Sequence, residues 1–343
     1  MKQFANILLC FTVVVLLLWQ LPWLINFVST PQGGGGHFTL YSPLVNDFIY
    51  NDIDQDNKLH RYGTDGHEYT EAETDSLLPF FYMRQLVADG RWSDTILGRA
   101  VSPQEVKAAS MIERINPRDV NSRPAALYPL LESMPKRVEL DMPNDVFRIT
   151  TEGIEFIVME TNQINESKSQ RYTKALLDKG FKFPARQVSG NPTTRKAYDE
   201  GYLLLDANNQ LFQLKRCAGR PFVKAFDIPE GIILTHIFEI EPAGRQLRGF
   251  ATDADQHFYV LTPDYKLAQV EIDHFDPTSE RLMIIGNLLD WTLSVTTDDG
   301  VHYYALSADD YHLLRRYDVT YPTGGVPGLH FTSGADTYCY PRF

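Results

Sequence analysis

An uncharged apolar segment at the N-terminus constrains this chain more than any other feature of its sequence. No Asp, Glu, Lys or Arg occurs between Lys2 and Asp47, and residues 4–28 within that stretch are almost entirely apolar. At about 1.5 Å per residue, an α-helix of this length crosses roughly 30 Å of hydrocarbon. The sequence therefore predicts a transmembrane anchor over residues 1–28, followed by a glycine-rich tether over residues 29–37.

The alternative to an anchor is a cleaved secretory signal. A signal peptide has an apolar core of roughly 7–15 residues and a small-residue cleavage site. Here the apolar run is longer and no A-x-A sequence follows it, so we expect an uncleaved single-pass anchor. Lys2 and the α-amino group are the positive charges near its ends, and they favour a cytoplasmic N-terminus. In a bacterium this topology puts the anchor in the inner membrane and the rest of the chain in the periplasm.

The rest of the chain has the composition of a folded protein. Hydrophobic residues make up 43% of the 343 residues and charged residues 22%, which argues against disorder. The net charge of −12 argues against a nucleic acid partner, because such a partner requires clustered cations. Three cysteines, Cys10, Cys217 and Cys339, are too few for a disulfide scaffold. An oxidising periplasm would allow Cys217 and Cys339 to pair, but two separately buried thiols are the preferred interpretation.

Residues 38–146 are expected to form an α+β region. The Asp-Gly turn within residues 59–69 predicts a β-hairpin, because type I′ turns need positive φ angles. Two capping boxes each predict the start of a helix. Their residues are Thr70 with Glu73, and Ser102 with Glu105. The second helix is expected to continue through residues 106–115, and five prolines make residues 116–143 an extended, ordered connector.

From residue 147 the chain repeats an apolar strand, an acidic turn and an aromatic strand. The first acidic residues of the four turns are Glu152, Asp206, Asp253 and Asp298, at spacings of 54, 47 and 45 residues. The last two spacings match the roughly 40–50 residues of a four-stranded propeller blade. We therefore predict a propeller-like domain over residues 147–343. An antiparallel meander whose hairpins share turn chemistry is the alternative.

The repeat leads to further expectations. If the turns are equivalent, the aromatic residues that follow three of them should occupy the same place in each blade. These residues are Phe212, Tyr259 and Tyr304. Two helical insertions are expected, at residues 166–179 with Leu176 and Leu177 facing inward and at residues 193–200, and residues 330–340 are interpreted as a truncated fifth copy.

No group of residues has the spacing of a known catalytic or metal site. Residues 52–57 resemble the opening of a calcium loop, but Asn57 stands where that loop has glycine, so a solvated hairpin is the better interpretation. Residues 190–196 suit an anion at a helix start, although capping explains them without a ligand. The nine histidines lack ligand spacing, and His274 with Asp276 is interpreted as structural. We therefore assign no catalytic, cofactor-binding or metal residue, and expect no cofactor.

Three strings of residues carry a family resemblance. They are residues 78–86 (LPFFYMRQL), 139–147 (ELDMPNDVF) and 190–202 (GNPTTRKAYDEGY). Over most of its length the chain resembles an uncharacterised bacterial family, a domain of unknown function best represented in Bacteroides and their relatives. The resemblance implies a single N-terminal anchor and genes beside those of ABC transporter subunits. It supplies no activity and no site residue.

Together these observations favour a noncatalytic, membrane-anchored accessory or binding protein. Its mainly β domain, with helical insertions, would be presented to the periplasm, and a membrane protein such as an ABC transporter subunit is the implied partner. Two other classes stay open. A carbohydrate-active enzyme uses carboxylates that are distant in sequence, so the lack of a local motif does not exclude one. A structural envelope-assembly protein needs no ligand at all.

Overall fold

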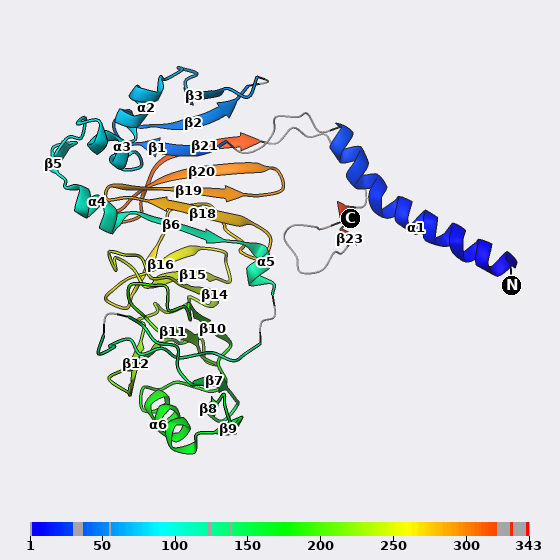
Figure 1. Ribbon diagram of the computed structural model, residues 1–343, viewed down its shortest axis with the longest axis vertical. Coiled ribbons are helices and arrows are strands. Elements are labelled where there is room, and N and C mark those ends of the chain that lie inside the picture. The colour runs from blue at the N-terminus through cyan, green and yellow to red at the C-terminus, as the bar shows by residue number, and fades with distance from the viewer. Residues whose placement is uncertain are drawn as a thin grey trace.

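The strands of this protein lie in separate antiparallel sheets that stack on one another (Figure 1). The structure is a computed structural model, and it describes residues 2–29, 37–54, 56–122, 125–137, 139–320, 330–331 and 341–342. The fold is mainly β and propeller-like, with an N-terminal apolar helix and helical insertions, as the sequence predicts. The sheets do not close into a ring, because the first and last sheets of the stack lie at opposite ends of the long axis.

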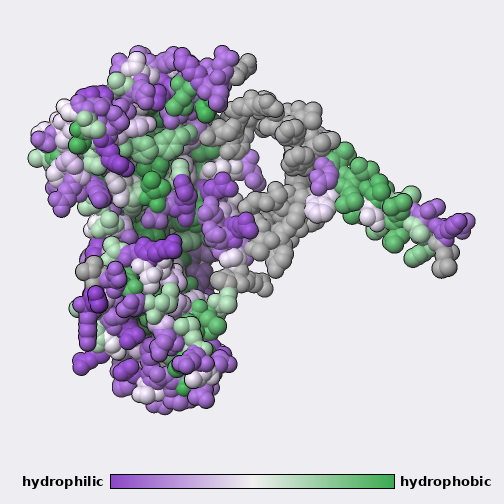
Figure 2. All heavy atoms as spheres, in the orientation of Figure 1, coloured by the Kyte–Doolittle hydropathy of each residue, from purple (hydrophilic) through white to green (hydrophobic). Residues whose placement is uncertain are grey.

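Helix α1 (Lys2–Ser29) confirms the predicted apolar segment. Its residues Lys2–Leu21 bury no surface inside the protein, and Figure 2 shows the helix as a mostly green rod beside a largely purple body. The length and composition of the helix suit a membrane span. An uncleaved anchor and a signal sequence share these properties.

Three consecutive four-stranded meanders form the middle and upper part of the stack. Their strands are β10 (Gln187–Gly190), β11 (Tyr202–Leu205), β12 (Leu211–Cys217) and β13 (Arg220–Ala225); β14 (Leu234–Glu239), β15 (Gly249–Asp253), β16 (Phe258–Leu261) and β17 (Leu267–Gln269); and β18 (Arg281–Gly286), β19 (Asp290–Thr296), β20 (Gly300–Ser307) and β21 (Leu313–Thr320). Within each meander every strand pairs with the next along the chain. Each sheet is therefore complete before the chain enters the next one.

The first half of the chain forms the two ends of the stack and the short helices. One end sheet contains β1 (Thr39–Ser42), β2 (Asp47–Ile53) and β3 (Leu59–Gly63), and the other contains β7 (Asp145–Ile149), β8 (Ile154–Val158) and β9 (Gln163–Ile164). The remaining elements are α2 (Glu71–Leu77), α3 (Met83–Ala88), β4 (Thr95–Ile96), β5 (Arg99–Ala100), α4 (Pro103–Ala109), β6 (Met111–Ile115), α5 (Pro117–Val120), α6 (Glu166–Leu177), β22 (His330–Phe331) and β23 (Pro341–Arg342).

The predicted repeat of hairpins is confirmed, although two of its turn residues are shifted. At each turn one N–H group donates to the carbonyl three or four residues later, and the donors are Thr150, Asp206, Asp253 and Thr297. The sequence alignment used Glu152 and Asp298, which lie two residues and one residue beyond these positions. A threonine hydroxyl bonds to nearby backbone groups much as a carboxylate does, so an alignment on acidic residues misplaced these two turns.

Phe212, Tyr259 and Tyr304 occupy equivalent places, as predicted. Each lies on the third strand of its meander and packs against the preceding sheet of the stack. The residues beside them on the strand face the following sheet, as Leu211 does in the first meander. Burial on both faces explains why central strands such as β11 (YLLL) and β16 (FYVL) have continuously apolar sequences.

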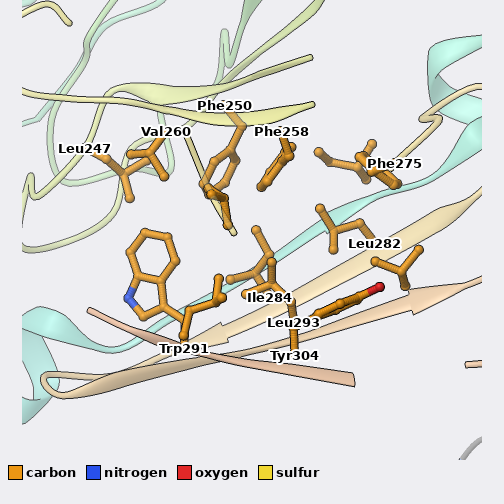
Figure 3. Close-up of a cluster of buried hydrophobic side chains, with 14 of the residues drawn as sticks. Leu247, Phe250, Phe258, Val260, Phe275, Leu282, Ile284, Trp291, Leu293 and Tyr304 are labelled. Atoms are coloured by element: carbon orange, nitrogen blue, oxygen red, sulfur yellow. The ribbon is translucent and has the colours of Figure 1, made fainter. Parts of the chain in front are cut away.

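Figure 3 shows one such interface between two sheets. Phe250, Phe258 and Val260 of β15 and β16 point toward side chains of the next sheet. The residues that meet them include Ile284 of β18 and Trp291 of β19. This interdigitation joins two meanders that share no backbone pairing.

The two ends of the stack expose polar or helical surface. On the outer face of the β7–β9 sheet, Arg148 Nε donates to Glu155 Oε2 at 2.6 Å. At the other end, Leu40 and Ile49 of the β1–β3 sheet pack against Leu78 of the α2–α3 region. Charged residues at one end and helices at the other therefore lie where a further sheet would have to stack.

Several sequence predictions need correction. The helix predicted to continue through residues 106–115 ends earlier, because α4 ends at Ala109. Residues 111–115 form strand β6 instead, since they pair with β18. In α6, Leu176 is fully buried but Leu177 is 52% exposed, since only one face of the helix meets the core. The fifth copy at residues 330–340 lies largely outside the described residues.

A buried ionic network replaces the helix that was predicted at residues 193–200. Lys196 Nζ lies 2.8 Å from Asp199 Oδ1 and 2.6 Å from Glu241 Oε1. Glu200 Oε2 lies 3.0 Å from Lys215 Nζ and 2.8 Å from Arg248 Nη1. These pairs join the β10–β13 sheet to the β14–β17 sheet, so the loop is held by contacts across sheets rather than by helical hydrogen bonds.

Glu239 of β14 lies beside this network without an ion-pair partner. Its side chain is buried, and neither carboxyl oxygen has a hydrogen-bond partner in the described part of the chain. Burial and the nearby Glu241 charge raise the pKa of Glu239 to about 9. The group therefore carries a proton at neutral pH.

Replacing Phe212 by alanine should lower the free energy of unfolding by about 3–5 kcal/mol, because the ring is buried between two sheets. Phe222→Ala on β13 of the same sheet is the matched control, since Phe222 is 36% exposed and should cost far less. Equilibrium denaturation in urea measures both changes. Equal losses for the two variants would contradict the proposed role of Phe212.

Glu239→Gln should stabilise the protein at pH 8 by a few kcal/mol, and the gain should shrink toward pH 5. The folded-state pKa of about 9 exceeds the unfolded value, so the wild type loses stability as pH rises between about 4.5 and 9. Denaturation at several pH values measures the difference. The exposed Glu230→Gln is the control and should change stability little. A gain that grows toward low pH would refute the assignment.

Candidate functional site

A cavity of about 220 Å³ lies between the β1–β3 sheet and the sheet formed by β6 and β18–β21. Residues from both sheets and from the connection between α2 and α3 line it. They include Leu40 and Tyr41 of β1, Leu78, Pro79, Phe80 and Phe81 of the connection, Ile112 of β6, Ile285 of β18, and Asp290 and Thr292 of β19. The lining is mostly apolar, as in small-molecule sites generally.

Local sequence signals hold the α2–α3 connection against this cavity. Thr70 and Glu73 form the predicted capping box that starts α2, and Thr70 Oγ1 accepts the Glu73 N–H. Pro79 separates α2 from α3, as expected from the missing N–H of proline. The connection packs Leu78 and Phe80 inward, and each is 6% exposed.

Asp290 is the charged residue of the cavity. It is the first residue of β19 and is 1% exposed. Its Oδ1 accepts a hydrogen bond from Asn287 Nδ2 at 3.0 Å, while its Oδ2 has no partner in the described part of the chain. Burial raises the pKa of Asp290 to about 7. At neutral pH the side chain of Asp290 therefore exists both as the protonated acid and as the carboxylate. Its Oδ2 can accept a hydrogen bond from a ligand.

The other polar groups beside Asp290 already have partners. The Tyr41 N–H donates to Thr292 Oγ1 at 2.9 Å, and the Tyr41 hydroxyl donates to Asn46 Oδ1 at 2.7 Å. Burial, followed by the Asp290 charge, raises the pKa of Tyr41, so this hydroxyl stays neutral. A ligand that fits the cavity therefore combines a compact apolar group with one N–H or cationic donor.

The residues weighed in the sequence for ligand binding have structural partners. Asp54 Oδ1 accepts the N–H groups of Asp56 and Lys58, so residues 52–57 contain a solvated β-hairpin turn, as preferred above. Lys196 is engaged with two carboxylates and is not available to an anion. His274 Nδ1 lies 3.1 Å from the Asp255 carbonyl, so it pairs with a backbone group rather than with Asp276.

Asp253, Asp255 and His257 form a cluster of potential metal ligands at the β15–β16 turn. Asp253 Oδ1 accepts two backbone N–H groups, and its Oδ2 lies 3.0 Å from His257 Nδ1 and accepts the Tyr259 hydroxyl at 2.7 Å. Turn closure therefore explains this cluster without an ion. Cys217 is a free thiol among the described residues, and Cys339, with which it could pair, lies outside them.

Sequence reasoning missed Asp290, although a signal was present. The residue is a single acid in the otherwise apolar string LLDWTL, and an acid inside a buried strand requires a partner or a proton. The cavity itself was not predictable, because its two walls are about 200 residues apart in the sequence. One of the strings that carry the family resemblance, residues 78–86, supplies part of its wall.

Comparison with solved structures finds matches of low similarity, two of which are propellers by name. The chain matches the structure of the Dos1 propeller with 11% identity and a TM-score of 0.28, over 85% of this chain and 62% of that one. It matches the Cps50 (Swd1) β-propeller domain of Myceliophteria thermophila with 7% identity and a TM-score of 0.27, over 84% and 87%. It also matches dihydro-heme d1 dehydrogenase NirN with 11% identity and a TM-score of 0.25, over 79% and 69%.

These scores are too low to carry an argument, so the fold assignment rests on the strand topology described above. No curated protein matches the chain. A family model described as "Domain of unknown function (DUF4857)" matches residues 38–306, which include all of the residues that line the cavity and the strands of the stack except β21 and the last residue of β20. The sequence resemblance to an uncharacterised family is thereby confirmed, and the chain belongs to the DUF4857 family.

Proposed function

We propose that this chain is a noncatalytic, membrane-anchored binding protein that holds a ligand in the cavity beside Asp290. The observation that carries the proposal is a buried carboxyl with one unpartnered oxygen in the wall of an apolar cavity. A buried polar atom without a partner costs about 1–3 kcal/mol, and a bound donor removes that cost. The propeller-like architecture, with its rigid stacked sheets, suits a binding role.

The size of the cavity limits the ligand. A cavity of about 150 Å³ accommodates benzene, so a volume of about 220 Å³ suits one ring or a short aliphatic group with a polar substituent. The unpartnered Asp290 oxygen favours an amine or amide N–H as that substituent. Such a group occurs in free amines and in side chains of a partner protein.

A binding role is preferred to catalysis because of the chemistry of the lining. Glycoside hydrolysis generally uses two carboxyl groups. Among the described residues that line the cavity, Asp290 is the one carboxylic acid. No residue there forms a nucleophile and base pair in the described part of the chain.

The anchor and the compartment complete the proposal. We infer that α1 remains attached, with a cytoplasmic N-terminus in a bacterial inner membrane and the stacked sheets in the periplasm. The uncharged apolar length of the helix and the lysine at its start support this topology. An ABC transporter subunit is the proposed partner, and it would be found by purifying the protein from membranes solubilised in mild detergent.

Benzylamine should bind the wild type at least tenfold more tightly than the Asp290→Asn variant. The amine donates to the Asp290 carboxylate, and a charge-assisted hydrogen bond contributes about 1.5–3 kcal/mol. Because the pKa of Asp290 is about 7, binding should be tighter at pH 8 than at pH 6. Thermal shift titrations of the full chain measure this affinity.

Two controls make the result specific to Asp290. Anisole, which has similar size and no N–H group, should bind both proteins alike. The exposed Asp56→Asn variant should leave benzylamine binding unchanged. Equal affinity of wild type and Asp290→Asn for benzylamine would refute the role of the carboxyl, and absence of binding would refute the ligand class.

The full chain should stay in the membrane pellet after extraction with alkaline carbonate, because an apolar helix of this length inserts stably. Mass spectrometry of the purified chain should find its N-terminus intact. A soluble form that begins near Thr30 would show that the helix is a cleaved signal and would overturn the anchor.

A further inference from the structure

We propose that a second site on this protein, a hollow lined by Arg114 and Arg281, binds the phosphate of a membrane lipid headgroup. The hollow has a volume of about 480 Å³ and lies between the start of β1 and the sheet formed by β6 and β18–β21. The proposal rests on the membrane anchoring proposed above. It is independent of the ligand at Asp290.

The register of the strands brings the two arginines together. Arg114 of β6 pairs with Met283 of β18, and Arg281 is two residues from Met283 on the same strand. Residues two apart on a strand share a face, so Arg114 and Arg281 are diagonal neighbours on one face of the sheet. Such diagonal neighbours are about 7–8 Å apart, which allows both guanidinium groups to reach one anion.

Both arginines lack an acidic partner. Each is exposed, and neither forms an ion pair or a side-chain hydrogen bond with another residue in the ranges that the structure describes. The lining of the hollow contains no Asp or Glu. In a chain with a net charge of −12, two unpaired arginines in an acid-free hollow are an unusual concentration of positive charge.

Polar groups around the arginines suit an oxyanion. The lining adds the hydroxyls of Ser294 and Thr296 on β19 and the side-chain amide of Asn116, whose Nδ2 also donates to Asp119 Oδ2 at 3.2 Å. Arginine binds phosphate with two parallel N–H groups, and hydroxyl or amide donors fill the remaining oxygen sites. The chemical class of the ligand is therefore a phosphate-bearing anion.

The position of the hollow in the chain argues for a lipid as the source of the phosphate. His37, the last residue of the tether, lines the hollow together with Phe38 and Thr39, which follow it. Seven residues lie between Ser29 at the end of α1 and His37, so the distance between these two residues is at most about 29 Å. The hollow is thus confined close to the membrane in which α1 is anchored, where lipid phosphates are the most concentrated anions.

Hydrogen exchange of the full chain tests this site, with residues 111–116 and 281–286 as the reporters. In nanodiscs that contain phosphatidylglycerol, without free phosphate, these amides should exchange more slowly than in nonionic detergent. The Arg114→Gln/Arg281→Gln variant should lose this protection. A second arm adds inorganic phosphate to the chain in nonionic detergent, and the same variant should weaken that binding at least tenfold.

The matched control is Arg195→Gln/Arg220→Gln, which removes the same charge from exposed positions on the β10–β13 sheet and its loop. It should keep the protection, and thermal unfolding should show that both double variants fold. Protection by inorganic phosphate but not by phosphatidylglycerol would overturn the lipid assignment in favour of a free anion. Protection that persists without the two arginines, or that is absent in both arms, would overturn the site. A chain that fails to enter nanodiscs would instead refute the anchor.

Discussion

The structure depends on one constraint, which is that every central sheet has two apolar faces and must be covered on both. β11 and β16 are buried along their whole length. A sheet of this kind is stable only between two neighbours, so the meanders stack instead of forming isolated domains. The stack can end where a sheet carries charge on its outer face, as at Arg148 and Glu155, or where helices cover it, as at α2 and α3.

The same constraint explains why the buried charges are informative. In the ionic network around Lys196 and Glu200, most charged groups form an ion pair with a group of opposite charge, so the network serves to join two sheets. Asp290 and Glu239 differ, because each is buried with at least one carboxyl oxygen that has no partner among the described residues. Glu239 is not among the residues that line the two cavities, and a bound proton is sufficient to neutralise its carboxylate. Asp290 lines a cavity, and there a ligand can supply the missing donor.

Both candidate sites lie in the same gap of the stack. The β1–β3 sheet covers strands β19–β21, and Tyr41 and Phe48 pack against Tyr303 there. Strand β6 adds one more strand to the covered sheet, which therefore extends beyond the β1–β3 sheet. Two hollows result, one apolar beside Ile112 and Asp290 and one cationic beside Arg114. The edge strand β6 contributes to both, so its addition to the third meander creates the binding surface that the repeats alone would lack.

The sequence by itself determined the apolar helix, the capping boxes and the series of hairpins. These depend on interactions between residues close in the chain, such as Thr70 with Glu73 or the backbone bonds that close the turn at Asp206. Only the tertiary structure decided that residues 111–115 pair as a strand, that the loop containing Lys196 is held by ion pairs, and that Asp290 faces a cavity. These features arise from contacts between segments that are far apart in sequence, and a local pattern of residue types carries no information about such partners.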